Sequence, residues 1–258
     1  MTSNTLKVNE SIRLPLWPGV DEESLRKTFR SIGPRAFERG YRQRPYSEEE
    51  KIFPSFLDCI QYGASWRNYY LMTPKKGWRF GVGCDLSRDN RSGNVIFVLA
   101  VDSENYRYPV DIRMGRWTSP QMADQIKTVN AEYHPDCVMV ENNGYQQALI
   151  DWMQQSEESV ELPLMAYTTT GKKKRDAAVG LPGLEIEFYN KLWRICIPEK
   201  HGFGCECAWC RWLHEMQNYP GSTDDTVMAC FFAREAIKFI CREYYRVVEA
   251  EDEDEDEF

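Results

Sequence analysis

Residues 78–87 read WRFGVGCDLS, and the pattern of this stretch guides the interpretation of the rest of the chain. Apolar side chains alternate at Phe80, Val82 and Cys84, which is typical of a strand with one face turned toward a core. The strand is expected to end at Asp85 and to be followed by a turn. A strand of this kind needs partners, and the neighbouring sequence supplies them.

Two more apolar strands follow at residues 93–101 (GNVIFVLAV) and 106–114, and their short polar connections favour an antiparallel meander. Ser119 is then expected to cap a helix that has Pro120 at its first position, which is a favoured place for proline. The run CVMVE at 137–141 is typical of a central, buried strand.

The second half of the chain continues with helices and strands. We expect a helix after Gly144, a strand at 162–167, short strands around 184–188 and 193–197, and helices at 207–218 and 225–245. The order β-β-β-α-β-α-β, followed by C-terminal helices, predicts an α/β fold with a mixed sheet. It is the order of a ribonuclease H-like sheet.

The N-terminal residues have a different pattern, without a steady period. LWPGVDEESLRKTFRSIG at 16–33 predicts a helix that is capped near Asp21 and ended by Gly33-Pro34, and a second short helix is expected over 35–43. We therefore expect a helical arm in front of the sheet.

The net charge is concentrated at the C-terminal end. The chain has 32 basic and 40 acidic residues, and eight of the acidic ones lie in the stretch 249–258. The rest of the chain is therefore neutral, so the acidic total does not argue against a nucleic-acid partner. Like charges in series repel and bury nothing, which predicts a disordered tail. The expected division is an arm or connector at 1–76, a body at 77–248 and an acidic tail at 249–258.

The composition excludes several classes of protein. With 258 residues, 42% hydrophobic and 13% aromatic, the chain has enough apolar material for one large core. No apolar run approaches the roughly 20 residues that span a bilayer, and no signal peptide is seen. The nine cysteines are an odd number. We expect a soluble protein in a reducing compartment, with no membrane partner.

Acidic residues stand where predicted elements end or begin. Asp85 closes the first strand, Glu141 closes the fourth, and Asp224 and Asp225 open the last helix. Taken singly, each acid fits a turn or a helix cap. Together, clustered carboxylates repel one another unless cations lie between them, and hard oxygen ligands suit Mg²⁺ or Mn²⁺. Two such ions can promote hydrolysis of a phosphodiester.

Three stretches around these acids carry a family resemblance. GVGCDLS (81–87), VMVENNGYQQALI (138–150) and PGSTDDTVMACFFA (220–233) resemble the three nuclease motifs of phage large terminase subunits. Those proteins are packaging motors with an N-terminal ATPase and a C-terminal ribonuclease H-like nuclease. Residues 16–45 are similar to the segment that closes the ATPase part, and EIEFYNKLWRICIP (185–198) is similar to a late hairpin.

The resemblance implies a two-metal DNA endonuclease that cuts concatemeric viral DNA during genome packaging in the host cytoplasm. It implies double-stranded DNA as substrate and an ATPase, a small terminase and a portal protein as partners. No G-x-x-x-x-G-K-[ST] loop is found, so the ATPase would be a separate chain or a missing part. The residues that match the metal-binding, catalytic acids, with Asp225 favoured over Asp224 as the primary ligand, are Asp85, Glu141, Asp224 and Asp225.

Two alternatives stay open at this point. One is another ribonuclease H-like nuclease, such as a junction resolvase or a transposase-like enzyme. The other is a non-catalytic packaging or scaffold-binding protein whose acids are structural. Cleavage assays on linear, junction and plasmid DNA separate these classes.

A basic run follows the fifth predicted strand, in TTTGKKKRD. A loop with this charge beside the acidic edge can grip phosphates, whereas a solvated helix start is the simpler interpretation. We expect DNA contact from Lys172, Lys173, Lys174 and Arg175.

A cysteine-rich motif, C-x-C-x-x-C, has the appearance of a zinc site. It comprises Cys205, Cys207 and Cys210, with His201 before it and His214 after it. Paired C-x-x-C knuckles are missing, and the matching family segment needs no structural metal. We therefore expect buried helix cysteines here and treat zinc as the less favoured interpretation.

Overall fold

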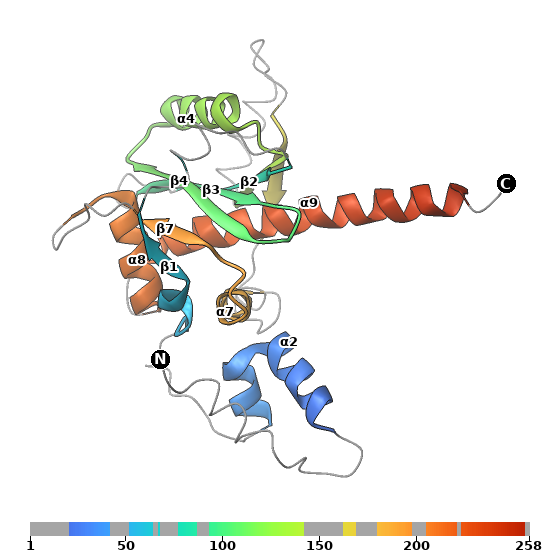
Figure 1. Cartoon of the computed structure of the whole chain (residues 1–258). Coiled ribbons are helices and arrows are strands. Elements are labelled where there is room, and N and C mark those ends of the chain that lie inside the picture. Colours follow the sequence, from blue (N-terminus) through green and yellow to red (C-terminus); the bar gives the residue numbers. More distant parts are fainter. Residues whose placement is uncertain are drawn as a thin grey trace.

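The computed structural model describes residues 21–41, 52–63, 67, 77–86, 93–141, 162–168, 180–197, 205–220 and 223–255 (Figure 1). The elements in these residues are α2 (Glu22–Gly40), the 3-10 helix η1 (Phe56–Cys59), β1 (Ile60–Tyr62), β2 (Arg79–Asp85), β3 (Asn94–Val101), β4 (Arg107–Gly115), α4 (Ser119–Tyr133), β5 (Cys137–Glu141), β6 (Leu164–Tyr167), α7 (Pro182–Tyr189), β7 (Ile195–Ile197), α8 (Ala208–Asn218) and α9 (Asp225–Glu255). None of the helices in these residues is both long and apolar enough to span a membrane.

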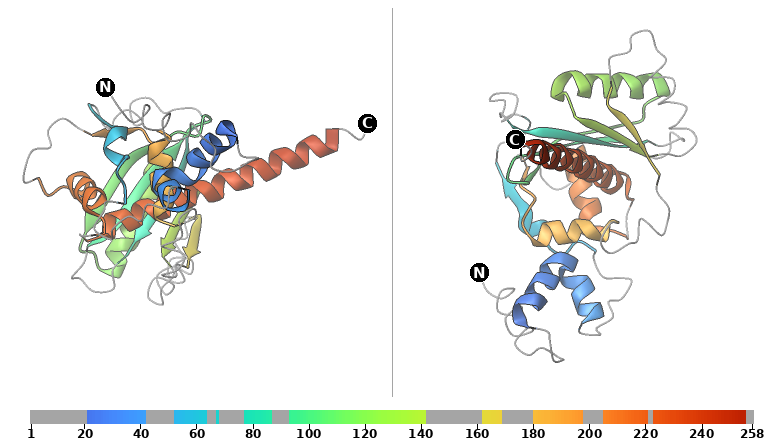
Figure 2. Two further views of the ribbon diagram at one scale, coloured as in Figure 1. Left: turned by 90° about the horizontal axis from the view of Figure 1, so that it is seen from below. Right: turned by 90° about the vertical axis from the view of Figure 1, so that its right-hand side faces the viewer.

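The centre of the fold is a five-stranded mixed sheet in the order β4-β3-β2-β5-β6. Strands β2, β3 and β4 pair antiparallel, and β5 and β6 continue the sheet parallel to β2. A meander followed by parallel strands is what the sequence pattern predicts, so the mixed α/β class and the ribonuclease H-like strand order are confirmed. Helix α4 covers one face of the sheet and α9 the other (Figure 2).

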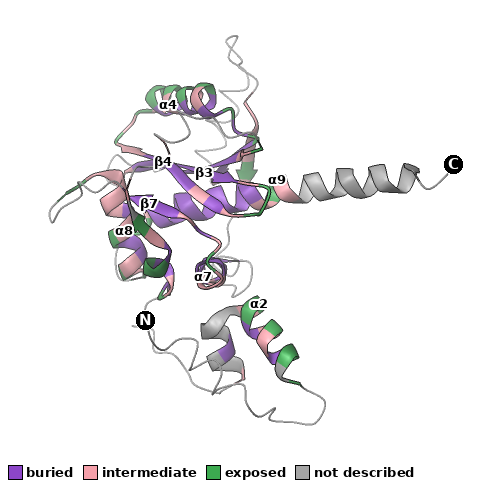
Figure 3. Ribbon diagram, viewed as in Figure 1, coloured by how far each residue is buried: buried purple, intermediate pink, exposed green. Residues whose placement is uncertain are grey.

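Burial on both faces explains why the strands are so apolar. Phe80, Val82 and Cys84 of β2 belong to the core cluster under α4, together with Met122 and Ile126 of that helix. All eight residues of β3 are buried, which fits a strand covered on both sides. The buried residues are concentrated in the sheet and in the first part of α9 (Figure 3).

The other face of β2 carries almost no side chain. A Cβ at Gly83 would lie 2.1 Å from both the carbonyl oxygen of Ala229 and the nitrogen of Ala233 in α9. At Gly81 a Cβ would lie 3.0 Å from atoms of Ala236 and Ile237. The helix backbone therefore packs directly on the backbone of β2, which only glycine permits.

Helix α4 begins one residue earlier than the sequence indicates. Thr118, and not Ser119, is its N-cap, and the Oε1 atom of Gln121 accepts from the Thr118 backbone N–H at 2.9 Å. The Thr118 side chain in turn accepts from the Gln121 backbone N–H, so two N–H groups at the start of the helix gain partners that the helix itself does not supply. One face of the helix is buried against the sheet, through Met122, Ile126, Val129 and Tyr133.

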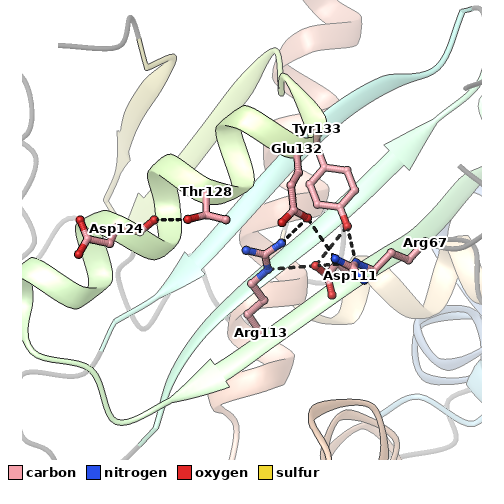
Figure 4. Close-up of polar contacts among 7 residues, drawn as sticks. All are labelled: Arg67, Asp111, Arg113, Asp124, Thr128, Glu132 and Tyr133. Atoms are coloured by element: carbon pink, nitrogen blue, oxygen red, sulfur yellow. Dashed lines mark hydrogen bonds and ion pairs between the residues drawn. The ribbon is translucent and has the colours of Figure 1, made fainter. Parts of the chain in front are cut away.

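A polar network fastens the C-terminal end of α4 to β4 (Figure 4). Arg113 contacts Asp111 at 3.0 Å and Glu132 at 2.6 Å. Arg67, from the predicted connector, bonds the Tyr133 hydroxyl at 3.0 Å and Glu132 at 3.2 Å. The connector thus contributes a side chain to the polar packing between helix and sheet.

Residues 184–188 are helical in α7, and the strand expected there is wrong. The alternation L-E-I-E-F suggests a strand, but Leu184 and Phe188 are buried four residues apart, as on a helix. The two glutamates are buried too, because each finds distant partners. Ser55 donates its Oγ–H to Glu185 at 2.6 Å, and Arg234 pairs with Glu187 at 2.7 Å.

The expected late hairpin is therefore replaced by a helix and a strand. Strand β7 pairs in parallel with β1, with Ile60 opposite Ile195. The 3-10 helix in front of β1 places Phe56 in the larger core, where it packs edge-on against Phe188 and Trp212. The division of the chain at residue 76 stays a prediction, although residues before it share this core.

Two helices run further than the sequence indicates. Asp21 caps α2 as expected, but the helix continues through Gly33-Pro34 to Gly40. Proline removes one hydrogen bond and bends a helix without having to end it, and the ribbon of α2 is bent (Figure 1). Helix α9 continues to Glu255, into the stretch 249–258 that is expected to be disordered. Extending an existing helix costs far less than starting one.

The helix expected after Gly144 lies outside the described residues. The other expected helices are present, as α8 over Ala208–Asn218 and α9 from Asp225.

The contact between β2 and α9 makes a direct test of the fold. Gly83→Ala inserts a Cβ against helix backbone that has no room to move, so we expect the free energy of unfolding to fall by about 3 kcal/mol or more. The measurement is urea unfolding followed by circular dichroism.

Gly63→Ala is the matched control, because its Cβ would meet only the Cys196 Sγ atom at an ordinary 3.7 Å. We expect it to change the stability by less than about 0.5 kcal/mol. Equal stability of the two variants would contradict the close packing of α9 on β2.

Candidate metal centre

Two of the expected acids lie on neighbouring parallel strands. Cys84 of β2 is the register partner of Val140 in β5, so the next residues, Asp85 and Glu141, are side by side at the carboxyl ends of their strands. Neighbouring strands lie about 4.8 Å apart. Cys84 and Val140 both belong to the core under α4, so alternation turns Asp85 and Glu141 toward the α9 face. Both acids are half-buried.

Helix α9 crosses this face and begins at the same edge. Gly81 faces residues 236–237 of the helix, and Gly83 faces residues 229–233. Two strand residues span about 6.6 Å, which corresponds to four or five residues at about 1.5 Å each along a helix. Continuing this relation by two strand residues brings Asp85 opposite the first turn of α9.

A second contact places the start of α9 at this edge. Asp225 accepts a hydrogen bond from the backbone N–H of Gly93, directly before β3. Because Asp85 is the register partner of Val95 in β3, Gly93 lies just beyond the end of β2. Asp85, Glu141 and Asp225 therefore come from three separate elements to one edge of the sheet. Asp224 directly precedes Asp225 in the sequence and is exposed.

Asp225 is held in an unusual electrostatic environment. The Arg211 Nη2 atom of α8 lies 2.9 Å from its Oδ2 atom, and its side chain is 16% exposed. Burial, the neighbouring Glu215 and Asp224 raise the pKa of Asp225 above its ordinary value, against the effect of Arg211 and Gly93. A carboxylate whose charge is disfavoured in this way gains from a nearby cation.

Glu215 of α8 is a residue that sequence reasoning missed. It is buried and accepts four hydrogen bonds: from the Thr226 N–H at 2.9 Å, the Thr226 hydroxyl at 2.5 Å, the Thr223 hydroxyl at 2.7 Å and the Arg211 Nε at 2.8 Å. Burial alone disfavours its charge, but the donors from Thr226, Arg211 and Thr223 outweigh burial and hold its pKa below the ordinary value. The sequence feature that could have pointed to Glu215 is its place as an acidic residue next to the apolar Met216.

Glu215 therefore fixes the approach to α9. Its bonds to Thr223 and Thr226 hold both sides of the Asp224-Asp225 pair, and its bond to Arg211 orients the guanidinium that meets Asp225. Glu215 therefore positions Asp225 indirectly, through Arg211, Thr223 and Thr226.

The expected acids share an edge, but they do not form a tight cluster. Within the described ranges, the one group of three or more possible ligands whose atoms all lie within 4.8 Å of one another is Cys205, Cys207 and Cys210. The assignment of Asp85, Glu141, Asp224 and Asp225 as metal ligands stays a prediction. Their hard oxygen donors fit Mg²⁺ or Mn²⁺ in kind.

The expectation that the cysteines of the motif are buried in a helix is wrong. Cys205 is exposed, and Cys207 and Cys210 are half-buried. Cys207 is the N-cap of α8, and its Sγ atom accepts from the Cys210 N–H at 3.4 Å. Burial and hydrogen bonds to Cys205 and Cys207 raise the pKa of Cys210 to about 12. His214 is exposed and is not part of the group.

The basic run Lys172, Lys173, Lys174 and Arg175 lies outside the described residues. Its contact with DNA stays a prediction.

Comparisons with known proteins give the following. No protein-family profile and no curated protein matches the chain. Among solved structures, the large terminase nuclease from thermophilic phage G20c with bound zinc has 14% sequence identity and a TM-score of 0.48, covering 71% of this chain and 97% of that one. The same nuclease with bound magnesium has 12% identity and a TM-score of 0.48, covering 72% and 97%.

A third structure of that nuclease, with bound cobalt, has 11% identity and a TM-score of 0.45, covering 72% and 97%. All three structures are of one phage large terminase nuclease.

The two coupled acids predict opposite effects on stability. A lowered pKa at Glu215 means that its charge stabilises the fold above the ordinary pKa, and that this stability is lost as the pH falls through the lowered value. We expect Glu215→Gln to lower the free energy of unfolding by about 2–4 kcal/mol at pH 7, because the amide cannot accept from four donors.

The raised pKa of Asp225 has the opposite sign, since stability present below the ordinary pKa is lost as the pH rises through the raised value. We expect Asp225→Asn at pH 7 to be at least as stable as the parent protein. Both variants are measured by urea unfolding with a chelator present. A stable Glu215→Gln variant together with an unstable Asp225→Asn variant would contradict this electrostatic arrangement.

Proposed function

We propose that this chain is a metal-dependent DNA endonuclease whose catalytic centre is the acidic edge formed by Asp85, Glu141 and Asp225, with Asp224 in support. The observation that carries the proposal is the convergence of acids from β2, β5 and the start of α9 on one edge and one face of the sheet. Acids that served only as turn formers or caps would have no reason to share a face.

The four carboxylates would hold two Mg²⁺ or Mn²⁺ ions. When bound, such ions supply Lewis-acid stabilisation of the phosphate charge and lower the pKa of water, which is what phosphodiester hydrolysis requires. Hard carboxylate oxygens match the preference of these ions.

Each acid has a distinct position in the proposed centre. Asp85 lies on the central strand, with Glu141 beside it on β5 and the first turn of α9 opposite. Asp225 is half-buried and oriented by Arg211, whereas Asp224 is exposed. This difference favours Asp225 over Asp224 as the primary ligand.

Arg211 is a positioning residue in this proposal. Its Nη2 atom holds Asp225 and its Nε atom holds Glu215, so the guanidinium fixes the carboxylate before any cation arrives. The charge of Asp225 is thereby kept at the edge, although burial disfavours it.

The proposed substrate is double-stranded DNA, and the proposed setting is the cutting of concatemeric viral DNA during packaging in the host cytoplasm. The resemblance of the motifs to terminase nucleases supports this setting. It also supports an ATPase, a small terminase and a portal protein as partners. Since the sequence has no phosphate loop, ATP hydrolysis would come from another chain or another part.

The central test replaces Asp85. We expect Asp85→Asn to reduce Mn²⁺-dependent nicking of supercoiled plasmid by at least about 10³-fold, because the amide removes the charge that balances the cations. DNA binding should change little, since it rests on basic residues. Glu141→Gln and Asp225→Asn should be similarly severe, and Asp224→Asn milder.

Asp124→Asn is the matched control, an acid-to-amide change at an exposed position of α4, on the opposite face of the sheet. It should leave nicking unchanged. Full activity in Asp85→Asn would end the proposal. A parent protein that does not nick DNA with Mg²⁺ or Mn²⁺ would favour a non-catalytic packaging role.

The basic run is tested by the salt dependence of binding. We expect replacement of Lys172, Lys173, Lys174 and Arg175 by Ala to weaken DNA binding and to flatten the slope of log K against log salt by about 0.9 for each lost phosphate contact. Binding is measured with a chelator, so that DNA is not cut.

A double replacement at Lys27 and Arg30, both exposed on α2, is the control and should leave the slope unchanged. If the quadruple variant keeps the parent slope, the basic run faces solvent only.

A further inference from the structure

Eight of the nine cysteines fall into two groups with different surroundings, and Cys241 stands apart from both. Five are buried and fill the core as small apolar side chains: Cys59, Cys84, Cys137, Cys196 and Cys230. Cys241 is half-buried by itself on α9. Cys205, Cys207 and Cys210 are instead accessible and close together, at the start of α8. Core packing does not account for this second group.

The three sulfur atoms have the spacing of a metal site. All of them lie within 4.8 Å of one another. Zinc binds thiolate sulfur at about 2.3 Å in a tetrahedron, which places the sulfurs about 3.8 Å apart. Small side-chain rotations therefore bring the present group to a ligated geometry.

The backbone at the start of α8 supplies a hydrogen-bond donor to one of the three sulfur atoms. Cys207 is the N-cap of α8, with its Sγ atom accepting from the Cys210 N–H at 3.4 Å. The C-x-x-C spacing brings Cys210 round the first helical turn to the same place. The positive end of the helix and this donated N–H add to the stabilisation that a bound metal ion gives to a thiolate.

We propose that Cys205, Cys207 and Cys210 bind one zinc ion, whose fourth position is taken by water or another ligand. Soft thiolates favour zinc, whereas the hard carboxylates of the acidic edge suit Mg²⁺ or Mn²⁺. The chain would thus carry two chemically separate metal sites. This inference does not depend on the proposed nuclease activity.

The zinc site would stabilise the part of the chain that orients the acidic edge. Arg211 follows Cys210 directly and pairs with both Asp225 and Glu215. An ion that joins residue 205 to the first turn of α8 fixes the backbone from which Arg211 extends. The expected role of the zinc is therefore structural.

Metal analysis of the purified full chain tests the site. The protein is dialysed without chelator, and its zinc content is measured by inductively coupled plasma mass spectrometry. We expect about one zinc per chain in the parent protein and a loss of at least about fivefold in Cys207→Ser. Cys241→Ser, a half-buried cysteine outside the group, should keep its zinc. Asp85→Asn should keep it too, which separates this site from the acidic edge.

Cobalt substitution provides a readout that needs no variant. Co²⁺ added to the zinc-free parent chain should give the near-ultraviolet absorption of thiolate-to-cobalt charge transfer, and stoichiometric zinc should remove it. This measurement keeps the proposal testable even if Cys207→Ser fails to fold.

Three results would overturn the proposal. The first is a parent chain that neither retains zinc nor gives the cobalt absorption. The second is an intact mass two hydrogens short, with a disulfide among the three cysteines of the freshly purified protein and no bound metal. The third is zinc that persists in Cys207→Ser but is lost in Asp85→Asn, which would place the ion at the acidic edge.

Discussion

The direct contact between the backbones of β2 and α9 is the constraint on which the rest of the structure depends. At Gly83 only glycine fits, because a Cβ would lie 2.1 Å from helix backbone, and at Gly81 a Cβ would lie 3.0 Å from the helix. The contact fixes both the distance and the axial position of α9 on the sheet. The larger core then forms around it, from α7, α8 and the residues before β1.

The same contact decides where charge can accumulate. Because α9 is fixed along β2, its first turn meets the strand ends, and Asp225 lies at the edge that carries Asp85 and Glu141. Glu215 and Asp224 disfavour the charge of Asp225, and this effect is offset in part by Arg211, which is itself held by the buried Glu215. The first turn of α8 supports this arrangement from outside the acidic edge, because it carries Arg211.

Buried ion pairs on the α9 face serve the same packing. Arg234 of α9 and Arg107 of β4 both meet Glu187 of α7, at 2.7 Å and 3.0 Å. Breaking one partner of such a group leaves an uncompensated charge in the core, which is far costlier than losing a surface pair. These partners come from distant parts of the chain, so no local window of sequence contains the interaction.

The sequence by itself determined the sheet and its edge. The order of apolar and polar side chains along the chain is a local pattern. It is clear at Phe80, Val82 and Cys84 and in the apolar run at 137–141, so the strands and the acids at their ends could be predicted. Only the tertiary structure decided that 184–188 is a helix, that Glu215 holds the acidic edge and that the three accessible cysteines meet. Periodicity records which side chains are apolar, whereas buried charges and clustered thiols are explained only by partners that folding brings from elsewhere.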